Sequence, residues 1–320
     1  MKKICFFCLL LMFIFVACNG YDNYSKTKLP EDYMKQLQIE KTNYTNAIKA
    51  DPSDFWKYAQ RADVNKKMGN YEEAIKDFDS ALAIDPDNYS LWYDKAWTYE
   101  YFRDYNQAIK CFDKIIELVP NNDRAYLDRA NMKERLNDLK GALEDCSKAI
   151  EINPTNDRAY VFRGNIKRHY NDDKGAIIDY SKAIEINPVN VNAYRERGFA
   201  VNAKDNFKEA VLDFEKIVKL CPNDSNAYDN LANAKAIMGD EKGALEAYNK
   251  AIELNPHHMY AYKNLAKLQR SMKLYSEALN SLNKALEIEP KNKEIQKNIE
   301  EVKEEIKKQD DYIKLTLQKS

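Results

Sequence analysis

The sequence predicts an all-α solenoid of stacked helix–turn–helix repeats, and three observations predict it. Eight of the nine prolines, from Pro52 to Pro290, follow one another at intervals of 34 residues. A small residue recurs with the same period, and an aromatic residue stands four positions before each of these small residues. A fixed period of this length is typical of helical hairpins that bury their apolar faces against their neighbours.

The first helix of each repeat is expected around the aromatic and the small residue, at about 55–68 in the first full repeat. A spacing of four places both residues on one helical face, where the small one lets another helix approach closely. The small residues are Ala62, Ala96, Ala130, Gly164, Gly198, Ala232 and Ala266. The aromatic residues are Tyr58, Trp92, Tyr126, Tyr160, Tyr194, Tyr228 and Tyr262.

The second helix, at about 71–84 in the first full repeat, carries an alanine and a larger residue four positions later, as in Ala74 and Phe78. The stretch AIEINP occurs at 149–154 and again at 183–188. Its proline ends the second helix, because a residue that precedes proline avoids the α region. Asn or Asp nearby provides the turn and caps the next helix.

Seven full repeats follow from this register, with an adapted segment at each end. A capping half-repeat is expected at 30–54 and a capping helix at 293–320, where Ile295, Ile299, Val302 and Ile306 form one apolar stripe. The same stripe fits heptad spacing, so a homodimer through 293–320 is the alternative. The repeats are expected at 55–88, 89–122, 123–156, 157–190, 191–224, 225–258 and 259–292.

These features resemble the tetratricopeptide repeat (TPR) family. The segment WYDKAWTYEYFRDYNQAIKCFDKIIELVP, at 92–120, carries the aromatic, small, Ala-x-x-x-Phe and Pro positions of that family. The resemblance covers 55–292 and implies a right-handed superhelix. In such a superhelix the first helices line a concave groove that holds peptides or partner segments.

Residues 1–17 have the pattern of a secretory signal peptide. Lys2 and Lys3 precede an uncharged apolar run that ends at Ala17. Fourteen helical residues span about 21 Å, which is short of a hydrocarbon core of about 30 Å. The segment FVAC, at 15–18, resembles the lipobox of bacterial lipoproteins. Ordinary signal-peptide cleavage and an uncleaved membrane anchor are the alternatives.

The lipobox resemblance implies that Cys18 is acylated, with chains such as palmitate, and anchors the protein to a membrane. Residues 18–29 then form a polar tether. Asn19 differs from the aspartate associated with inner-membrane retention, which favours the outer membrane of a bacterial envelope. We therefore expect a lipid-anchored protein that faces the periplasm or the cell surface.

Composition argues against several function classes. Lysine and arginine number 50 against 51 aspartates and glutamates, whereas nucleic-acid binders usually carry a basic excess. The three histidines form no HExxH motif, and no Cys/His spacing fits zinc. Cys111, Cys146 and Cys221 lie far apart and are expected to be buried thiols. We expect a non-enzymatic protein without a metal, a cofactor or a nucleic-acid partner.

The binding residues should lie on the first helices. Asn131, Asn165 and Asn233 resemble the asparagine ladder of some peptide-binding repeat arrays, since an amide can pair with any peptide backbone; asparagine merely tolerated on a polar face is the alternative. Aromatic and arginine residues are typical of interface hot spots. The expected groove residues are Trp56, Tyr93, Trp97, Arg124, Asn131, Arg158, Asn165, Arg168, Arg195, Phe199 and Asn233.

A second set of cations has a structural interpretation. Arg61, Lys95, Arg129, Arg163 and Arg197 recur every 34 residues, each directly before the packed small residue. At this position their stems should line the contacts between repeats rather than form a ladder for anions.

The leading hypothesis is a membrane-anchored interaction scaffold that binds an extended, acidic and partly apolar peptide in its groove. A carrier of envelope glycan or peptidoglycan fragments is the second hypothesis, because Tyr93, Trp97 and Tyr101 could stack on sugars. A structural protein that dimerises is the third.

Overall fold

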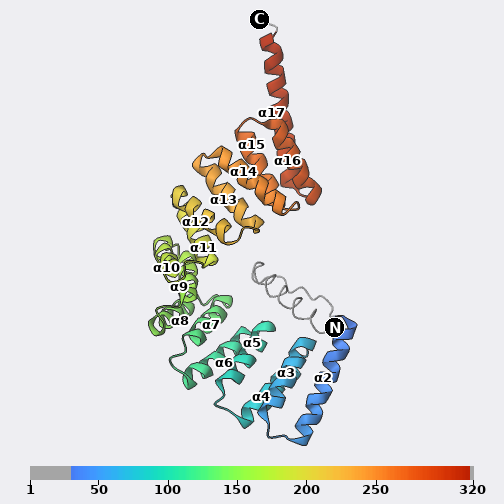
Figure 1. Cartoon of the computed structure of the whole chain (residues 1–320), viewed down its shortest axis with the longest axis vertical. Helices are drawn as coiled ribbons and strands as arrows, with labels where there is room; N and C mark the ends of the chain where they lie inside the picture. Colours follow the sequence, from blue (N-terminus) through green and yellow to red (C-terminus); the bar gives the residue numbers. More distant parts are fainter. Residues whose placement is uncertain (1–29, 318–320) are drawn as a thin grey trace. The chain divides into compact units, whose positions relative to one another are not determined.

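The computed structural model describes residues 30–317, and these form sixteen α-helices in sequential antiparallel order (Figure 1). The predicted all-α class is confirmed. The chain divides into two compact units, an N-terminal unit that ends at Tyr170 and a C-terminal unit that begins at Asn171. The predicted signal peptide, the predicted tether and the predicted acylation site at Cys18 lie outside the described residues.

Within each unit, each helix packs against the next one in the chain. The N-terminal unit contains α2 (Glu31–Ala50), α3 (Phe55–Met68), α4 (Tyr71–Ile84), α5 (Tyr89–Tyr101), α6 (Tyr105–Leu118), α7 (Asp123–Arg135), α8 (Leu139–Ile152) and α9 (Asp157–His169). The C-terminal unit contains α10 (Asp173–Ile186), α11 (Val191–Asn202), α12 (Phe207–Leu220), α13 (Ser225–Met238), α14 (Glu241–Leu254), α15 (Met259–Ser271), α16 (Tyr275–Ile288) and α17 (Lys293–Leu317).

The recurrent prolines stand just beyond the second helices. Helix α8 ends at Ile152, the N–H of Asn153 donates to the Ala149 carbonyl at 2.9 Å, and Pro154 follows. Proline has no N–H with which to continue the helical hydrogen bonds. Asn156 then caps α9 by accepting from the N–H of Ala159 at 3.1 Å. AIEINP is therefore a helix end followed by its stop signal.

The turn inside each hairpin places one residue in the left-handed region. Gly69 and Gly239 occupy this position in two hairpins, with φ of 79° and 88°. Glycine adopts such angles without strain, and asparagine and aspartate adopt them readily, whereas most other residues cost about 1–2 kcal/mol each. Among the described residues the same conformation is found at Asn137, Asn171 and Asp205, whose residue types tolerate it, and also at Arg103 and Lys273, whose residue types do not. Packing of the flanking helices therefore dictates the turn where the sequence does not favour it.

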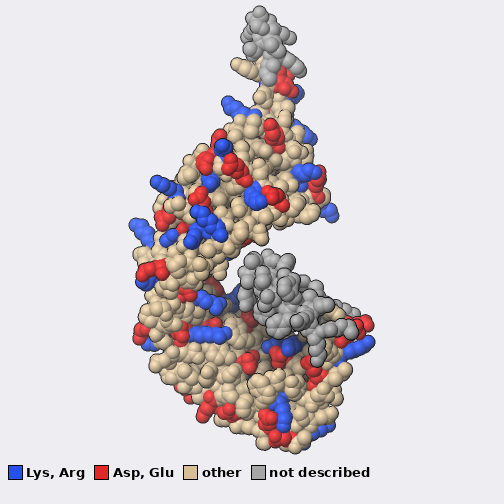
Figure 2. All heavy atoms as spheres, in the orientation of Figure 1, with Lys and Arg blue, Asp and Glu red and all other residues tan. Residues whose placement is uncertain are grey.

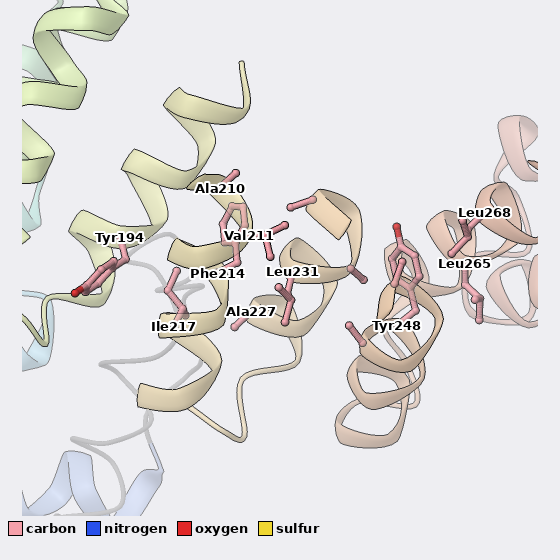
Figure 3. Packing of buried hydrophobic residues seen from close by; sticks show 14 of the residues in the cluster. Tyr194, Ala210, Val211, Phe214, Ile217, Ala227, Leu231, Tyr248, Leu265 and Leu268 are labelled. Atoms are coloured by element: carbon pink, nitrogen blue, oxygen red, sulfur yellow. The ribbon is translucent and has the colours of Figure 1, made fainter. Parts of the chain in front are cut away.

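The core of each unit is built from the recurrent small and large residues. Ala62, Ala96, Ala130 and Ala232 have no exposed surface. Large side chains from the second helices fill the space beside them, as Phe214 does in the cluster of the C-terminal unit (Figure 3). Gly198 shows how close this approach is, because a Cβ added there would lie 3.0 Å from Phe214 Cζ.

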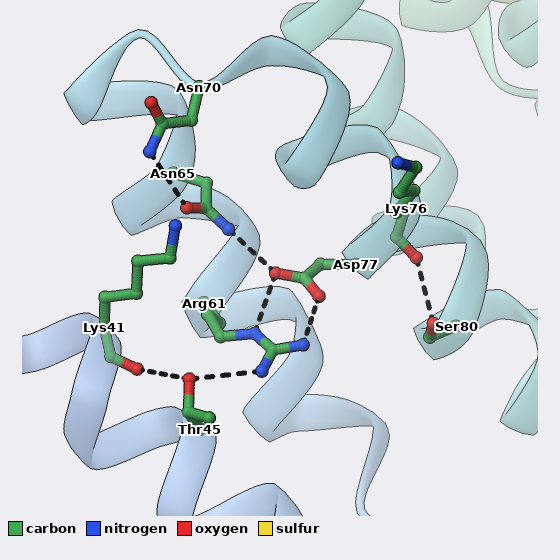
Figure 4. A network of polar contacts seen from close by, with 8 residues as sticks. All are labelled: Lys41, Thr45, Arg61, Asn65, Asn70, Lys76, Asp77 and Ser80. Carbon is green, nitrogen blue, oxygen red and sulfur yellow. Dashed lines mark hydrogen bonds and ion pairs between the residues drawn. The ribbon is translucent and has the colours of Figure 1, made fainter.

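The recurrent arginines bind buried aspartates of the second helices. Arg61 donates to both carboxylate oxygens of Asp77, at 3.0 and 2.6 Å, and to the hydroxyl of Thr45 at 3.2 Å (Figure 4). Arg129 contacts Asp145 in the same way, and Arg197 contacts Asp213. These three arginines therefore have the expected structural role, because their guanidinium groups are hydrogen-bonded to side chains of neighbouring helices.

The chain varies both partners of this pair together. Where Cys111 replaces the aspartate, Lys95 replaces the arginine and turns to Asp79 of the preceding hairpin. Where Ala247 replaces the aspartate, Leu231 replaces the arginine. A buried carboxylate thus occurs here together with its cation, as the cost of burying an unpaired charge requires.

The apolar stripe of the C-terminal helix packs within the C-terminal unit. Ile295, Ile299 and Val302 of α17 are buried in a cluster with Leu282 of α16. Arg270 of α15 forms ion pairs with Glu301 and Glu305 at 2.8 Å. A homodimer through this segment would have to use other side chains of α17.

Candidate functional site

The predicted binding residues lie on first helices of the hairpins, in both units. Charged side chains of both signs are scattered over the face of the molecule in Figure 2, with no single-sign field. The N-terminal unit holds Trp56, Tyr93, Trp97, Arg124, Asn131, Arg158, Asn165 and Arg168, and the C-terminal unit holds Arg195, Phe199 and Asn233.

Aromatic side chains line the first helices of the N-terminal unit. Trp56 on α3 is 60% exposed. Tyr93 and Trp97 on α5 are half-buried, and both rings stand edge-on to the buried Phe112, with centroids 5.9 and 6.0 Å away. Phe112 thus holds these two rings in place while part of each stays accessible. Rigid aromatic surface of this kind is typical of interface hot spots.

Arg124 on α7 lies over the ring of Tyr93, with its Cζ 5.5 Å from the ring centroid. The side chain of Arg124 is 71% exposed, so its guanidinium can still meet a partner. Tyr93 is oriented by Asn122, which lies 3.2 Å from its hydroxyl. The aromatic ring restricts the conformations of the guanidinium that lies on it, so this cation is preorganised to bind a carboxylate.

Asp128 lies one helical turn beyond Arg124, and its side-chain pKa is strongly perturbed. Arg124 Nε is 3.4 Å from Asp128 Oδ2, yet that buried oxygen accepts no hydrogen bond from the described residues. Burial raises the pKa of Asp128 to about 6, although the charges of Arg124 and of Arg158 on α9 oppose the rise. A carboxylate that is desolvated and incompletely paired is a recognised sign of a functional site.

The predicted binding residues of the C-terminal unit make more of their contacts with other residues of the same unit. Arg195 donates to Asn192 Oδ1 at 3.0 Å and lies 3.7 Å from Asp224. Phe199 is partly exposed and packs on Phe214, with ring centroids 5.4 Å apart. The Asn233 amide donates to the Asp229 carbonyl, and its oxygen accepts from Tyr248 at 2.9 Å. Asn233 is therefore engaged within the fold through both its amide nitrogen and its amide oxygen.

Two polar groups that matter here were not among the predicted site residues. Asp128 could have been suspected from its i, i+4 spacing to Arg124. Asn202, at the end of α11, has a buried side-chain oxygen without a hydrogen-bond partner in the described part of the chain. No sequence pattern distinguishes Asn202 from the other asparagines. The burial of its amide depends on residues of other helices, which the sequence around Asn202 does not reveal.

Comparison with protein families identifies the repeats. Models described as tetratricopeptide repeat match residues 67–130, 123–156 and 235–298. The chain is a tetratricopeptide repeat protein. A search among curated proteins finds no match to this TPR chain.

Solved structures with the same fold include several TPR proteins. A C-terminal part of a TPR protein from Cytophaga hutchinsonii superposes with a TM-score of 0.61 at 20% identity, covering 76% of this chain and 98% of that one. A TPR protein from Parabacteroides merdae gives 0.54 at 18% identity, covering 78% and 98%. YrrB, described as a TPR protein with an unusual peptide-binding site, gives 0.52 at 25% identity, covering 58% and 96%.

TPR domains are typically non-enzymatic scaffolds that bind peptides or proteins. In the described part of this TPR chain, no group of three or more His, Cys, Asp or Glu side chains is placed to hold a metal ion. Cys111 and Cys146 are buried as expected, whereas Cys221, at the end of α12, is only partly buried. Burial raises the pKa of the Cys111 thiol to about 12. None of the helices between residues 30 and 317 is long and apolar enough to cross a membrane.

Proposed function

We propose that the first helices of the N-terminal unit bind an extended, acidic segment of a partner protein. The observation that carries the proposal is the incompletely paired Asp128 carboxylate beside an exposed Arg124 stacked on Tyr93. Such a group costs stability in the free protein, and a costly carboxylate of this kind is expected where a side chain is retained for binding.

The two kinds of group have complementary roles in this proposal. Arg124 and Arg158 meet a carboxylate of the partner, and bidentate contact with a guanidinium would fix its orientation. Asp128 Oδ2 is buried, so Asp128 accepts an N–H of the peptide backbone through the part of its side chain that stays exposed, 16% of the surface. Trp56, Tyr93 and Trp97 contact apolar side chains of the same segment. An asparagine ladder through Asn131 and Asn165 would add sequence-independent backbone contacts.

We expect Arg124→Ala/Arg158→Ala to weaken peptide binding about tenfold or more, as loss of one charge-assisted contact would. The probe is a library of fluorescent nonapeptides with fixed acidic or fixed basic positions, read by anisotropy. Lys110→Ala/Lys140→Ala is the control, because it removes two exposed charges from second helices of the same unit.

Selection of basic peptides, or equal losses in the control, would contradict the acidic-segment proposal. Binding of soluble peptidoglycan fragments without any peptide binding would instead support the carrier hypothesis. Unchanged binding in Asn131→Ala/Asn165→Ala/Asn233→Ala would remove the ladder from the proposal.

We further propose that acylation of Cys18 anchors this scaffold to a bacterial envelope membrane, with Asn19 favouring the outer membrane. The lipobox resemblance of FVAC, at 15–18, supports the proposal. Two or more acyl chains hold a protein firmly, because each buried CH₂ contributes about 0.8 kcal/mol.

Cys18→Ser is expected to shift the protein from the acylated mature form to an unprocessed or released form. Mass spectrometry of the N-terminus, together with membrane fractionation, measures this shift. Cys8→Ser is the matched control, because it changes a cysteine inside the apolar run. A wild-type N-terminus that begins elsewhere and carries no acyl group would rule out this mode of anchoring.

A further inference from the structure

The outward face of the second helices carries a repeated ion pair. A lysine is followed three residues later by a glutamate on α6, α8, α10, α14 and α16, and each pair is closed at 2.8 or 2.9 Å. Ion pairs between residues three positions apart are common on solvent-exposed helix faces, where the positive and negative charges balance. The face is therefore electrically neutral along most of the chain.

Helix α12 breaks the pattern. Lys216 occupies the lysine position, but Lys219 replaces the glutamate. Lys208 lies two turns before Lys216 on the same stripe, and none of the three lysines has an ion pair among the described residues. The acidic side chains of α12 are engaged elsewhere, since Glu215 pairs with Lys235 and Glu209 accepts from Asn206.

Exposed aliphatic side chains lie between these lysines and at the equivalent place on α10. Leu212 stands four residues after Lys208 and is 59% exposed. Ile178 occupies the same repeat position on α10, four residues after Lys174, and is 68% exposed. The other second helices have Lys, Glu or Asn at this position. The two adjacent hairpins therefore share an outward face that is both basic and apolar, which we call the α10–α12 face.

We infer that the α10–α12 face docks on an anionic lipid surface. Aliphatic side chains between lysines can enter the headgroup region while the ammonium groups reach the lipid phosphates. The composition favours lipid over a protein partner, because protein interfaces are depleted in lysine and enriched in arginine and aromatic residues. This surface is separate from the proposed peptide site, which belongs to the N-terminal unit.

The inference does not depend on acylation of Cys18. An anchor elsewhere in the chain would only raise the local concentration of the face near the membrane. Each lysine near an anionic surface contributes about fivefold to binding, so four lysines with two aliphatic side chains suffice for peripheral contact at high lipid concentration.

The test uses the full chain with vesicles of phosphatidylcholine alone or with 30% phosphatidylglycerol. Lysines are acetylated briefly by a membrane-impermeant reagent and quantified by mass spectrometry. We expect the acetylation of Lys208, Lys216 and Lys219 to fall at least fivefold in the anionic vesicles only. Lys114 and Lys148, which lie on the same kind of face but are paired with glutamates, should not change.

Two variants distinguish an effect of the α10–α12 face from an effect of the net charge of the protein. Lys219→Glu restores the periodic pair on α12 and should abolish the protection, because it removes one positive charge and adds a negative one. Lys267→Glu, at an exposed position on α15, makes the same change in net charge and should leave the protection intact. Equal acetylation in both vesicle types would overturn the inference. Protection by a lipid-free envelope protein fraction, without protection by anionic vesicles, would also overturn it and assign the face to a protein.

Discussion

Replacing Arg197 by leucine is expected to lower the free energy of unfolding of the C-terminal unit by about 3 kcal/mol at pH 7.5. Arg197 donates to both carboxylate oxygens of Asp213, at 2.9 and 2.6 Å. Asp213 is only 2% exposed. Burial raises the pKa of Asp213, but the guanidinium opposes the rise and keeps the carboxylate paired. Without Arg197 an uncompensated charge stays buried.

The chain itself supplies the compensating change. Leu231 and Ala247 occupy the positions of Arg197 and Asp213 one repeat later, and both are buried there. The double variant Arg197→Leu/Asp213→Ala should therefore recover most of the loss, to within about 1 kcal/mol of the wild type. Replacing a buried ion pair by apolar residues is often neutral, whereas breaking it is not.

Urea unfolding followed by circular dichroism measures the overall change. Hydrogen exchange of α11 and α12 amides localises it, because repeat arrays need not unfold in one step. The loss in the single variant should shrink near pH 4, where Asp213 can take up a proton. Equal destabilisation of the single and double variants would show that the arginine acts through its packing, not through the buried carboxylate.

Replacing Asp128 by asparagine is expected to have the opposite sign and to stabilise the N-terminal unit by about 2 kcal/mol at pH 7.5. Burial raises the pKa of Asp128 from 3.8 to about 6. The folded state therefore binds a proton more readily than the unfolded state, so stability falls as pH rises from about 4 to 6. Above pH 6 the full cost of the charged form is present, and asparagine removes it.

The pH dependence distinguishes this explanation from a general effect of the substitution. The gain from Asp128→Asn should nearly disappear at pH 3, where the wild-type carboxyl is mostly protonated in both the folded and the unfolded state. Asp63→Asn is the matched control on α3, because ion pairs with Lys66 and Lys67 lower the pKa of Asp63. That control should give no gain at pH 7.5. A gain that is independent of pH would show that the Asp128 charge is not its source.

Peptide binding should change in the direction opposite to stability. If Asp128 accepts an N–H of the partner, Asp128→Asn weakens binding while it stabilises the free protein. Such opposition is expected where a group is kept for function at a cost to the fold. Improved stability together with unchanged binding would remove Asp128 from the proposed site.

Much of the fold was predictable because its signals are local. A spacing of three or four residues defines one face of a helix, and a proline stops the helix beside it. Ala62 and Phe78 occupy buried positions that this spacing implies, and Asn156 caps a helix as its residue type suggests. The residue types at Arg103 and Lys273 did not predict the left-handed turn they form, because the packing of two helices outweighs a local preference.

The sequence by itself determined the period, the helical hairpins and the TPR family, since these follow from contacts that every repeat makes again. Only the tertiary structure decided which polar side chains are already satisfied. Arg129 and Arg124 lie five residues apart on α7, yet Arg129 is bound to Asp113 and Asp145 while Arg124 stays exposed over Tyr93. The partners of both arginines lie on other helices. Whether a polar side chain is buried and hydrogen-bonded therefore depends on neighbouring residues that the repeat pattern does not specify.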